Sequence, residues 1–178
     1  MKETGSKGYD ALMIIIHWMS ALLVFGLFAL GWWMVDLTYY SNWYTTAPWW
    51  HKSLGLLVLF ITLFRVVWRL IKGTPTIDGS AFEKKAAKFG HLLLYISLLA
   101  VVFSGYLIST GEGKPISFFG WFDVPALPFQ IEQQATLAGT IHEYAAYVLV
   151  ILALGHGVMA LKHHFIDKRS TLIRMIKP

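Results

Sequence analysis

The sequence predicts an all-α membrane protein, an antiparallel bundle of four transmembrane helices. The 178 residues are 56% hydrophobic and only 14% charged, and a soluble domain of this size has too little interior to bury so much apolar surface. Four long apolar segments each approach the roughly 20 residues that a helix needs to cross a bilayer. The chain shows no internal repeat and no low-complexity tract, so we expect a single domain over residues 1–178.

The four helices are expected at about residues 11–35, 48–71, 82–110 and 138–164. The first apolar segment is longer than the core of a cleavable signal peptide and lacks a small-residue cleavage site, so we interpret it as retained. Pro48 suits the first turn of the second helix, where its missing N–H costs nothing. Ser80 and Glu83 have the spacing of a capping box that opens the third helix.

Positive charges predict the orientation of the bundle, because Lys and Arg concentrate in cytoplasmic segments. Thirteen of the fifteen lie on one side: two before the first helix, six at or between the ends of the second and third, and five from the end of the fourth onward. Only Lys52 and Lys114 lie on the other side. Both termini are therefore predicted to be cytoplasmic. The net charge of +5 then reflects topology, and nucleic acid is not an expected partner.

The chain has no cysteine. This excludes disulfides, cysteine-ligated zinc, iron–sulfur clusters and haem attached through C-x-x-C-H. Any cofactor must be held by histidine, methionine or oxygen ligands, and the chain has seven histidines. The two outer loops, residues 36–50 and 112–139, are rich in Trp, Tyr and Phe, which anchor proteins at the membrane interface.

The predicted topology sorts the histidines by depth in the bilayer. His142 and His156 lie fourteen residues apart on the fourth helix, so both leave nearly the same helix face, roughly 21 Å apart along the axis. His51 matches His142 near the outer side, and His17 matches His156 near the cytoplasmic side. Ionisable groups in a membrane core are expensive and usually face a functional interior. His91 also lies near the cytoplasmic side and could replace His17 or His156 as a ligand.

Paired imidazoles on facing helices are suited to axial ligation of a haem iron, whose flat macrocycle fills a bundle core. The two pairs predict two stacked haem groups. Gly55, one turn after His51, would let a planar group approach the helix backbone. Arg65 shares the helix face of His51 at cytoplasmic depth and could pair with a propionate of the inner haem, as Lys52 could outside. Zinc is the alternative, but a structural zinc site needs about four ligands at one level.

Several motifs resemble the bacterial cytochrome b561 family, and the resemblance covers nearly the whole chain. The motifs are IIHW at residues 15–18, HKSLG at 51–55, GHLLLY at 90–95, KHHF at 162–165 and TLIRM at 171–175, with GKPIS at 113–117 and FDVP at 122–125 resembling one subgroup. The resemblance implies a four-helix protein of the bacterial inner membrane with two non-covalent haem b groups. Carried over, the family pattern ligates one haem with His17 and His156 and the other with His51 and His142.

The resemblance also implies a ubiquinone site near the cytoplasmic-side haem. His163 matches a quinone-contacting position in the family, and His91 is a second candidate. A family member like this can act as a superoxide oxidase, which passes the electron of superoxide through the haems to ubiquinone. The predicted function is therefore di-haem electron transfer linked to the quinone pool, with superoxide:ubiquinone oxidoreduction as its specific form.

Two other interpretations stay open. The protein could be a haem-binding membrane anchor subunit that passes electrons between quinone and a periplasmic redox protein docked on the aromatic outer loops. It could instead be a haem-free four-helix transporter or metal sensor that uses histidines as transient ligands. The expected partners are membrane lipids and quinone, with superoxide or a periplasmic redox protein as the electron donor.

Overall fold

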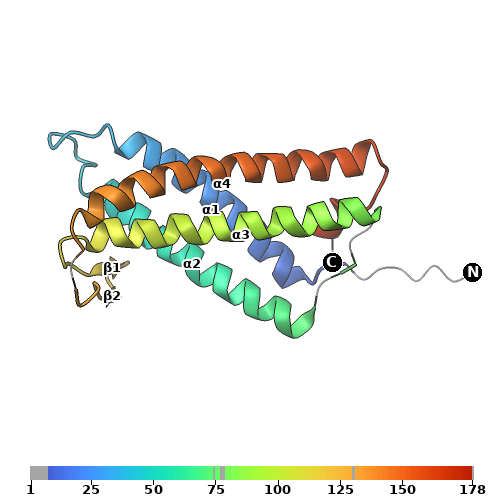
Figure 1. Ribbon diagram of the computed structural model, residues 1–178, viewed down its shortest axis with the longest axis horizontal. Coiled ribbons are helices and arrows are strands. Elements are labelled where there is room, and N and C mark those ends of the chain that lie inside the picture. The colour runs from blue at the N-terminus through green and yellow to red at the C-terminus, as the bar shows by residue number, and fades with distance from the viewer. Residues whose placement is uncertain (1–7, 74, 77–78, 130, 178) are drawn as a thin grey trace, which may run out of the picture.

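The computed structural model describes residues 8–73, 75–76, 79–129 and 131–177. Four long helices form a bundle (Figure 1); they are α1 (Ala11–Met34), α2 (Thr46–Lys72), α3 (Ala81–Thr110) and α4 (Gln134–Phe165). All four are long and apolar enough to cross a membrane, which confirms the predicted all-α transmembrane class. Lys2 and Lys7, which contributed to the predicted orientation, lie outside the described residues.

Local sequence signals mark the beginnings of the first three helices. Asp10 caps α1, because its side chain accepts a hydrogen bond from the backbone N–H of Met13 at 2.8 Å. The capping box predicted for α3 is confirmed: Ser80 Oγ accepts from the Glu83 N–H, and the Glu83 carboxylate accepts from the Ser80 N–H. Pro48 lies in the first turn of α2, where the helix has no use for its missing donor.

Helix α4 begins at Gln134, earlier than the expected residue 138. Gln133 adopts the left-handed conformation (φ 54°, ψ 24°) and ends the preceding loop. The side chain of Gln134 is buried, and its amide donates to the carbonyl of Leu107 on α3 at 2.9 Å. Because the polar side chain is satisfied inside the protein, the helix extends beyond the apolar segment that hydropathy identified.

A small hairpin covers the end of the bundle where α2 and α4 begin. Strand β1 (Ile116–Phe118) pairs antiparallel with β2 (Phe122–Val124). The buried side chains of β1 pack against Leu56 of α2, and Ser53 Oγ donates to the Ser117 carbonyl at 3.3 Å. We call this end of the molecule the hairpin end. The opposite end, where α1 begins and α4 ends, is called the terminal end.

Polar contacts connect the helices at the terminal end. Trp68 Nε1, near the end of α2, donates to the Asp10 carboxylate at 2.9 Å. Trp18 Nε1 on α1 donates to the carbonyl of Met175 at 2.7 Å, within the short 3-10 helix η1 (Ile173–Met175). These bonds hold the C-terminal segment and the ends of α1 and α2 together.

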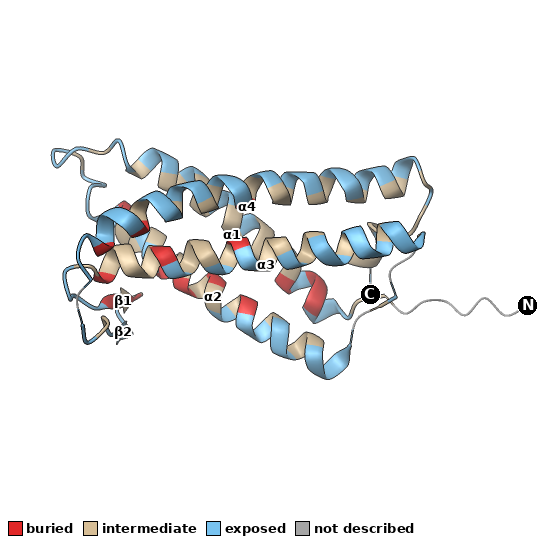
Figure 2. Cartoon of the chain, viewed as in Figure 1, coloured by how far each residue is buried: buried red, intermediate tan, exposed pale blue. Residues whose placement is uncertain are grey.

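Most of the helical surface is exposed, and buried residues gather near the hairpin end and at the start of α1 (Figure 2). The exposed side chains include many large hydrophobic ones, such as Leu22 at 74% and Leu70 at 79%. A water-soluble protein rarely shows so large an apolar surface, whereas lipid is its natural surrounding. The outside of the bundle is therefore apolar, and the histidines lie between the helices.

Candidate functional site

Two histidines face each other near the hairpin end. His51 on α2 and His142 on α4 have ring centroids 6.1 Å apart, with ring planes at 69°. Both are half-buried. The structure thus brings together two residues that sequence analysis matched by depth. We call them the hairpin-side pair.

Groups from α1 and α3 position the rings of the hairpin-side pair. His142 Nδ1 lies 2.8 Å from the carbonyl of Val101, so it donates its proton there and leaves Nε2 as the free ligand atom. A Cβ added at Gly105 would stand 3.0 Å from His142 Cε1, and one added at Gly31 would stand 3.1 Å from His51 Cε1. Any larger residue at these two positions would push against the imidazoles. Val101 and Gly31 carry no spacing signal that sequence analysis could have used.

Three histidines gather near the terminal end. His17 on α1 and His156 on α4 have ring centroids 6.2 Å apart at 67°, a geometry close to that of the hairpin-side pair. His91 on α3 lies 5.3 Å from the His156 centroid at 59°. His156 therefore has two neighbouring imidazoles. The sequence left open whether His91 replaces one of the other two as a ligand, and the geometry leaves the same choice open. We call these three residues the terminal-side histidines.

Arg65 lies close enough to the terminal-side histidines to act on them electrostatically. Its guanidinium carbon is 5.9 Å from the ring centroid of Tyr95. Arg65 Nε, the Tyr95 hydroxyl and His91 Nδ1 are all buried and have no hydrogen-bond partner in the described part of the chain. A buried polar atom left unpaired costs roughly 1–3 kcal/mol. A polar or anionic group bound in this region would give these three atoms partners.

The residues of both sites fit a haem group. Two imidazoles that bind one metal from opposite sides, at a metal–nitrogen distance of about 2 Å, have ring centroids roughly 6 Å apart. Half-buried Gly55, one turn after His51, leaves open space, because an added Cβ there would meet no atom within 4 Å. Arg65 offers a buried donor for a propionate. Lys52, the other predicted propionate partner, is exposed beside His51.

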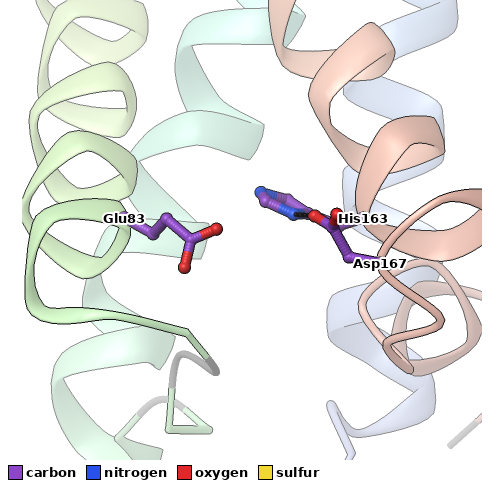
Figure 3. A group of neighbouring side chains, drawn as sticks. All are labelled: Glu83, His163 and Asp167. Atoms are coloured by element: carbon purple, nitrogen blue, oxygen red, sulfur yellow. Dashed lines mark hydrogen bonds and ion pairs between the residues drawn. The ribbon is translucent and has the colours of Figure 1, made fainter.

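His163 lies at the terminal end and has two carboxylate neighbours (Figure 3). Its Nδ1 is 2.6 Å from an oxygen of Asp167, and Glu83 approaches from the start of α3. Sequence analysis selected His163 but missed both carboxylates. The four-residue spacing of Asp167 was a usable signal, since side chains at that spacing meet on a helix. Glu83 comes within 4.8 Å of these ligand atoms from a position too distant in the sequence to be found in that way.

Comparison with known proteins gives a consistent result. The model of the family described as prokaryotic cytochrome b561 matches residues 8–178. Cytochrome b561 homolog 2 of Escherichia coli K12 is 51% identical over 170 residues, which cover 94% of this chain and 90% of the relative. Cytochrome b562 of Cereibacter sphaeroides is 30% identical, with 98% and 99% covered. A Yersinia pestis protein named probable superoxide oxidase CybB is 28% identical, with 96% of each chain covered.

Proposed function

Because the chain belongs to the prokaryotic cytochrome b561 family, we propose that it transfers electrons across the membrane through two haem b groups to quinone. Family membership by itself makes the chain a haem b electron-transfer protein of a membrane. One observation carries the finer proposal. Two imidazole pairs, with ring centroids 6.1 Å and 6.2 Å apart, lie toward opposite ends of one helical bundle.

In this proposal, His51 and His142 hold one haem, and His17 and His156 hold the other. When bound, the haem groups supply reversible one-electron chemistry at iron. The chain orients the ligand rings and excludes water with its apolar helices. Arg65 balances the charge of a propionate near the terminal end, where its Nε is buried without a partner among the described residues.

We place the protein in the bacterial inner membrane with both termini in the cytoplasm. The distribution of Lys and Arg supports this orientation, and it puts the hairpin end on the periplasmic side. Electrons would then enter at the hairpin end and leave at the terminal end. His163 and His91 are the candidate contacts for the quinone, because both lie on the cytoplasmic half of the bundle.

The proposed electron donor is superoxide. Support comes from the relative whose printed name is probable superoxide oxidase, with 96% of both chains covered. The hairpin end offers limited positive charge to attract an anion: Lys52 is exposed, whereas Lys114 is paired with Glu112 at 2.7 Å. We therefore expect superoxide oxidation to depend only weakly on ionic strength.

The first test is the haem-to-protein ratio of the purified chain, together with its reduced spectrum. We expect about two haem b groups per chain, one for each bis-histidine pair. One group per chain would show that one pair is misassigned. No haem would contradict the proposal. The same preparation should reduce ubiquinone when superoxide is supplied.

A variant of His163 tests the proposed link to quinone separately. His163→Ala is expected to slow quinone reduction about 100-fold or more, the usual effect of losing a proton-transfer group, while superoxide still reduces the haems. Pre-steady-state absorbance separates the two steps. Quinone turnover at the wild-type rate would remove His163 from the site.

The alternative function is that of an anchor subunit for a periplasmic redox protein. Exposed aromatic side chains at the hairpin end favour it, including Tyr40 at 80% and Trp121 at 77% exposure, and Tyr and Trp are common in protein interfaces. The isolated chain decides between the two functions. Haem reduction by superoxide without any other protein supports the first, whereas reduction that requires an added periplasmic protein supports the anchor.

A further inference from the structure

Two cavities lie between α2 and α3. The first, of about 390 Å³, is at the terminal end, where Figure 1 shows the two helices diverging. We call it the basic cavity; its walls are Tyr95 of α3 and, on α2, Val66, Arg69, Leu70 and Gly73. The second, of about 570 Å³, is nearer the hairpin end and is lined mostly by apolar side chains of both helices and by residues 124–125. We call it the apolar cavity.

Helical periodicity joins the two cavities into one groove. On α3, Tyr95 lines the basic cavity, whereas Leu99 and Tyr106 line the apolar one. Spacings of four and seven residues place these three on one stripe of the helix. On α2, Leu59 of the apolar cavity and Val66 of the basic cavity are also seven residues apart. The same stripe of each helix therefore lines both cavities.

The terminal end of this groove is positively charged. Arg69 lines the basic cavity, and exposed Lys88 lies on the same stripe of α3, seven residues before Tyr95. Neither cation forms an ion pair within the described part of the chain. The described carboxylates of this end have other partners: Asp10 accepts from Trp68, Glu83 from Arg169 and Asp167 from Lys162. The two cations can therefore attract an anion from outside the chain.

The side chain of Arg69 is what suits the basic cavity to an anion. The end of α2 does not do so by itself, because a helix C-terminus carries partial negative charge. Gly73 ends the helix, and its N–H donates to the Arg69 carbonyl at 3.0 Å. An anion must then be held by cationic side chains. The planar guanidinium of Arg69 presents a fork of N–H donors that matches the oxygens of a phosphate group.

The length of the groove fits one phospholipid molecule. Ten residues separate Arg69 from Leu59, which is about 15 Å along the helix axis. One leaflet supplies half of a hydrocarbon core of about 30 Å. An acyl chain that starts from a phosphate beside Arg69 therefore reaches the apolar cavity. A free phosphate ion would use Arg69 but would gain nothing from the apolar walls.

We propose that the groove between α2 and α3 binds one anionic phospholipid, with its phosphate on Arg69 and one acyl chain in the apolar cavity. Lys88 adds to the attraction for the headgroup, as basic residues between transmembrane helices do. In the orientation proposed above, this lipid belongs to the cytoplasmic leaflet. The inference goes beyond the proposed electron transfer, and none of the histidines lines either cavity.

Native mass spectrometry of the haem-loaded protein, released from detergent, measures the binding directly. The probes are dioleoyl phosphatidylglycerol, which is anionic, and dioleoyl phosphatidylcholine, which has the same chains and no net charge. We expect one phosphatidylglycerol per chain at concentrations where phosphatidylcholine does not bind. Arg69→Gln should weaken this binding about tenfold, the usual effect of losing a charged hydrogen bond. Arg69→Lys should lose less, because it keeps the charge.

Lys72→Gln is the matched control for the headgroup, because it removes one positive charge from the same end of α2. Lys72 lies over the Trp68 ring, 5.6 Å from its centroid, and does not line the basic cavity. This variant should bind phosphatidylglycerol like the wild type. Equal weakening in Arg69→Gln and Lys72→Gln would show that only the general charge of the surface matters, and equal binding of the two lipids would show no headgroup selection. Either result overturns the proposal.

A second variant tests the acyl chain. Leu59→Trp should weaken phosphatidylglycerol binding, because the larger side chain fills the apolar cavity. Leu22→Trp is the matched control, since Leu22 is 74% exposed on α1, and it should bind like the wild type. Wild-type binding in Leu59→Trp would contradict a chain in this cavity.

Competition distinguishes the lipid from other occupants. Inorganic phosphate at millimolar concentration should not displace phosphatidylglycerol, and neither should ubiquinone. Displacement by phosphate would show a site for free anions, and displacement by ubiquinone would show a quinone site; both overturn the proposal.

Haem content and melting temperature, measured on the same preparations, show whether each variant folds. Haem content should stay unchanged in Arg69→Gln. Its loss there would assign Arg69 to a haem propionate and overturn the lipid site. A wild-type chain that binds phosphatidylglycerol selectively but contains one haem would contradict the proposed function and leave the lipid site intact.

Discussion

At the hairpin end, His51 and His142 face each other and no third histidine, whereas at the terminal end His156 lies near both His17 and His91. The spacing within the two pairs is nearly the same, so distance alone does not distinguish the sites. They differ in what surrounds the rings. At the hairpin end the polypeptide backbone packs against the rings, whereas at the terminal end other ionisable side chains surround them.

This difference affects how each site acquires its geometry. Gly31 and Gly105 lie where a Cβ would crowd the hairpin-side rings, and the Val101 carbonyl fixes the tautomer of His142. Packed helices hold such contacts before any cofactor binds. Among the described residues, three buried polar atoms without partners lie around the terminal-side histidines, on Arg65, Tyr95 and His91, whereas the hairpin-side pair has one, His51 Nδ1. We infer that the fold pre-organises the first site, whereas the second takes its final form with the bound group.

The largest expected effect comes from removing a ligand at each site. His142→Leu should lower the haem content by about half, because the hairpin-side pair has no third imidazole to replace it. His17→Leu should lose less, because His91 lies close enough to His156 to take its place. A haem assay per chain measures both. His91→Leu is the control and should retain full haem content. Equal losses of haem in His142→Leu and His17→Leu would show that His91 does not act as a substitute ligand at the terminal-side site.

A smaller effect should follow when the backbone packing of the hairpin-side pair is disturbed. A side chain at position 105 would stand 3.0 Å from the His142 ring, so Gly105→Val should move the ring away from the Val101 carbonyl. Loss of such a supporting contact typically costs 10–100-fold in metal affinity. Haem retention during dilution, followed by absorbance, measures the change.

The matched control for this variant is Gly26→Val on α1, because a Cβ at position 26 would meet no atom within 4 Å. It should retain haem like the wild type. If Gly105→Val and Gly26→Val lose haem equally, general helix destabilisation explains the effect. The inference of a pre-organised pair would then be wrong.

The sequence predicts those parts of this molecule that depend on composition and periodicity. Apolar length locates all four helices, and the capping box at Ser80 follows from a spacing of three residues. Helical periodicity and the distribution of charge also match His51 with His142 and His17 with His156. These signals are local or regularly repeated, so a single sequence is enough to find them.

The parts that could not be predicted are contacts between distant segments. The hairpin is bound to α2 by the hydrogen bond from Ser53 to the Ser117 carbonyl. Helix α4 begins early because the Gln134 side chain donates a hydrogen bond to the Leu107 carbonyl. Each of these two hydrogen bonds depends on which distant segment of the chain packs against Ser53 or Gln134 in the folded protein. The same holds for Gly31, which differs from Gly26 on the same helix in that a Cβ there would meet His51. The choice between His17 and His91 also stays open, because both residues reach His156.

The smallest expected effect is on thermal stability, which depends on the polar contacts at each end of the bundle. At the terminal end, hydrogen bonds from the Trp68 indole and then from the Met13 N–H lower the pKa of Asp10. A carboxyl group whose pKa is lower in the folded state stabilises the fold fully above its unfolded pKa of about 3.9, and this contribution disappears as the pH falls through the folded value. Asp10→Ala removes a helix cap worth on the order of 1 kcal/mol.

Thermal unfolding in detergent should therefore show Asp10→Ala melting about 2–4 °C below the wild type at pH 7, with the difference shrinking near pH 3. The hairpin end provides the contrast, because fully buried Ser53 joins it through neutral bonds to Ser117 and Phe119. Ser53→Ala should lower the melting temperature by a similar amount at both pH values, since no group in that contact titrates. A deficit in Asp10→Ala that is the same at both pH values would show that the carboxylate acts only through packing. The contacts that stabilise the terminal end would then be independent of pH, like those at the hairpin end.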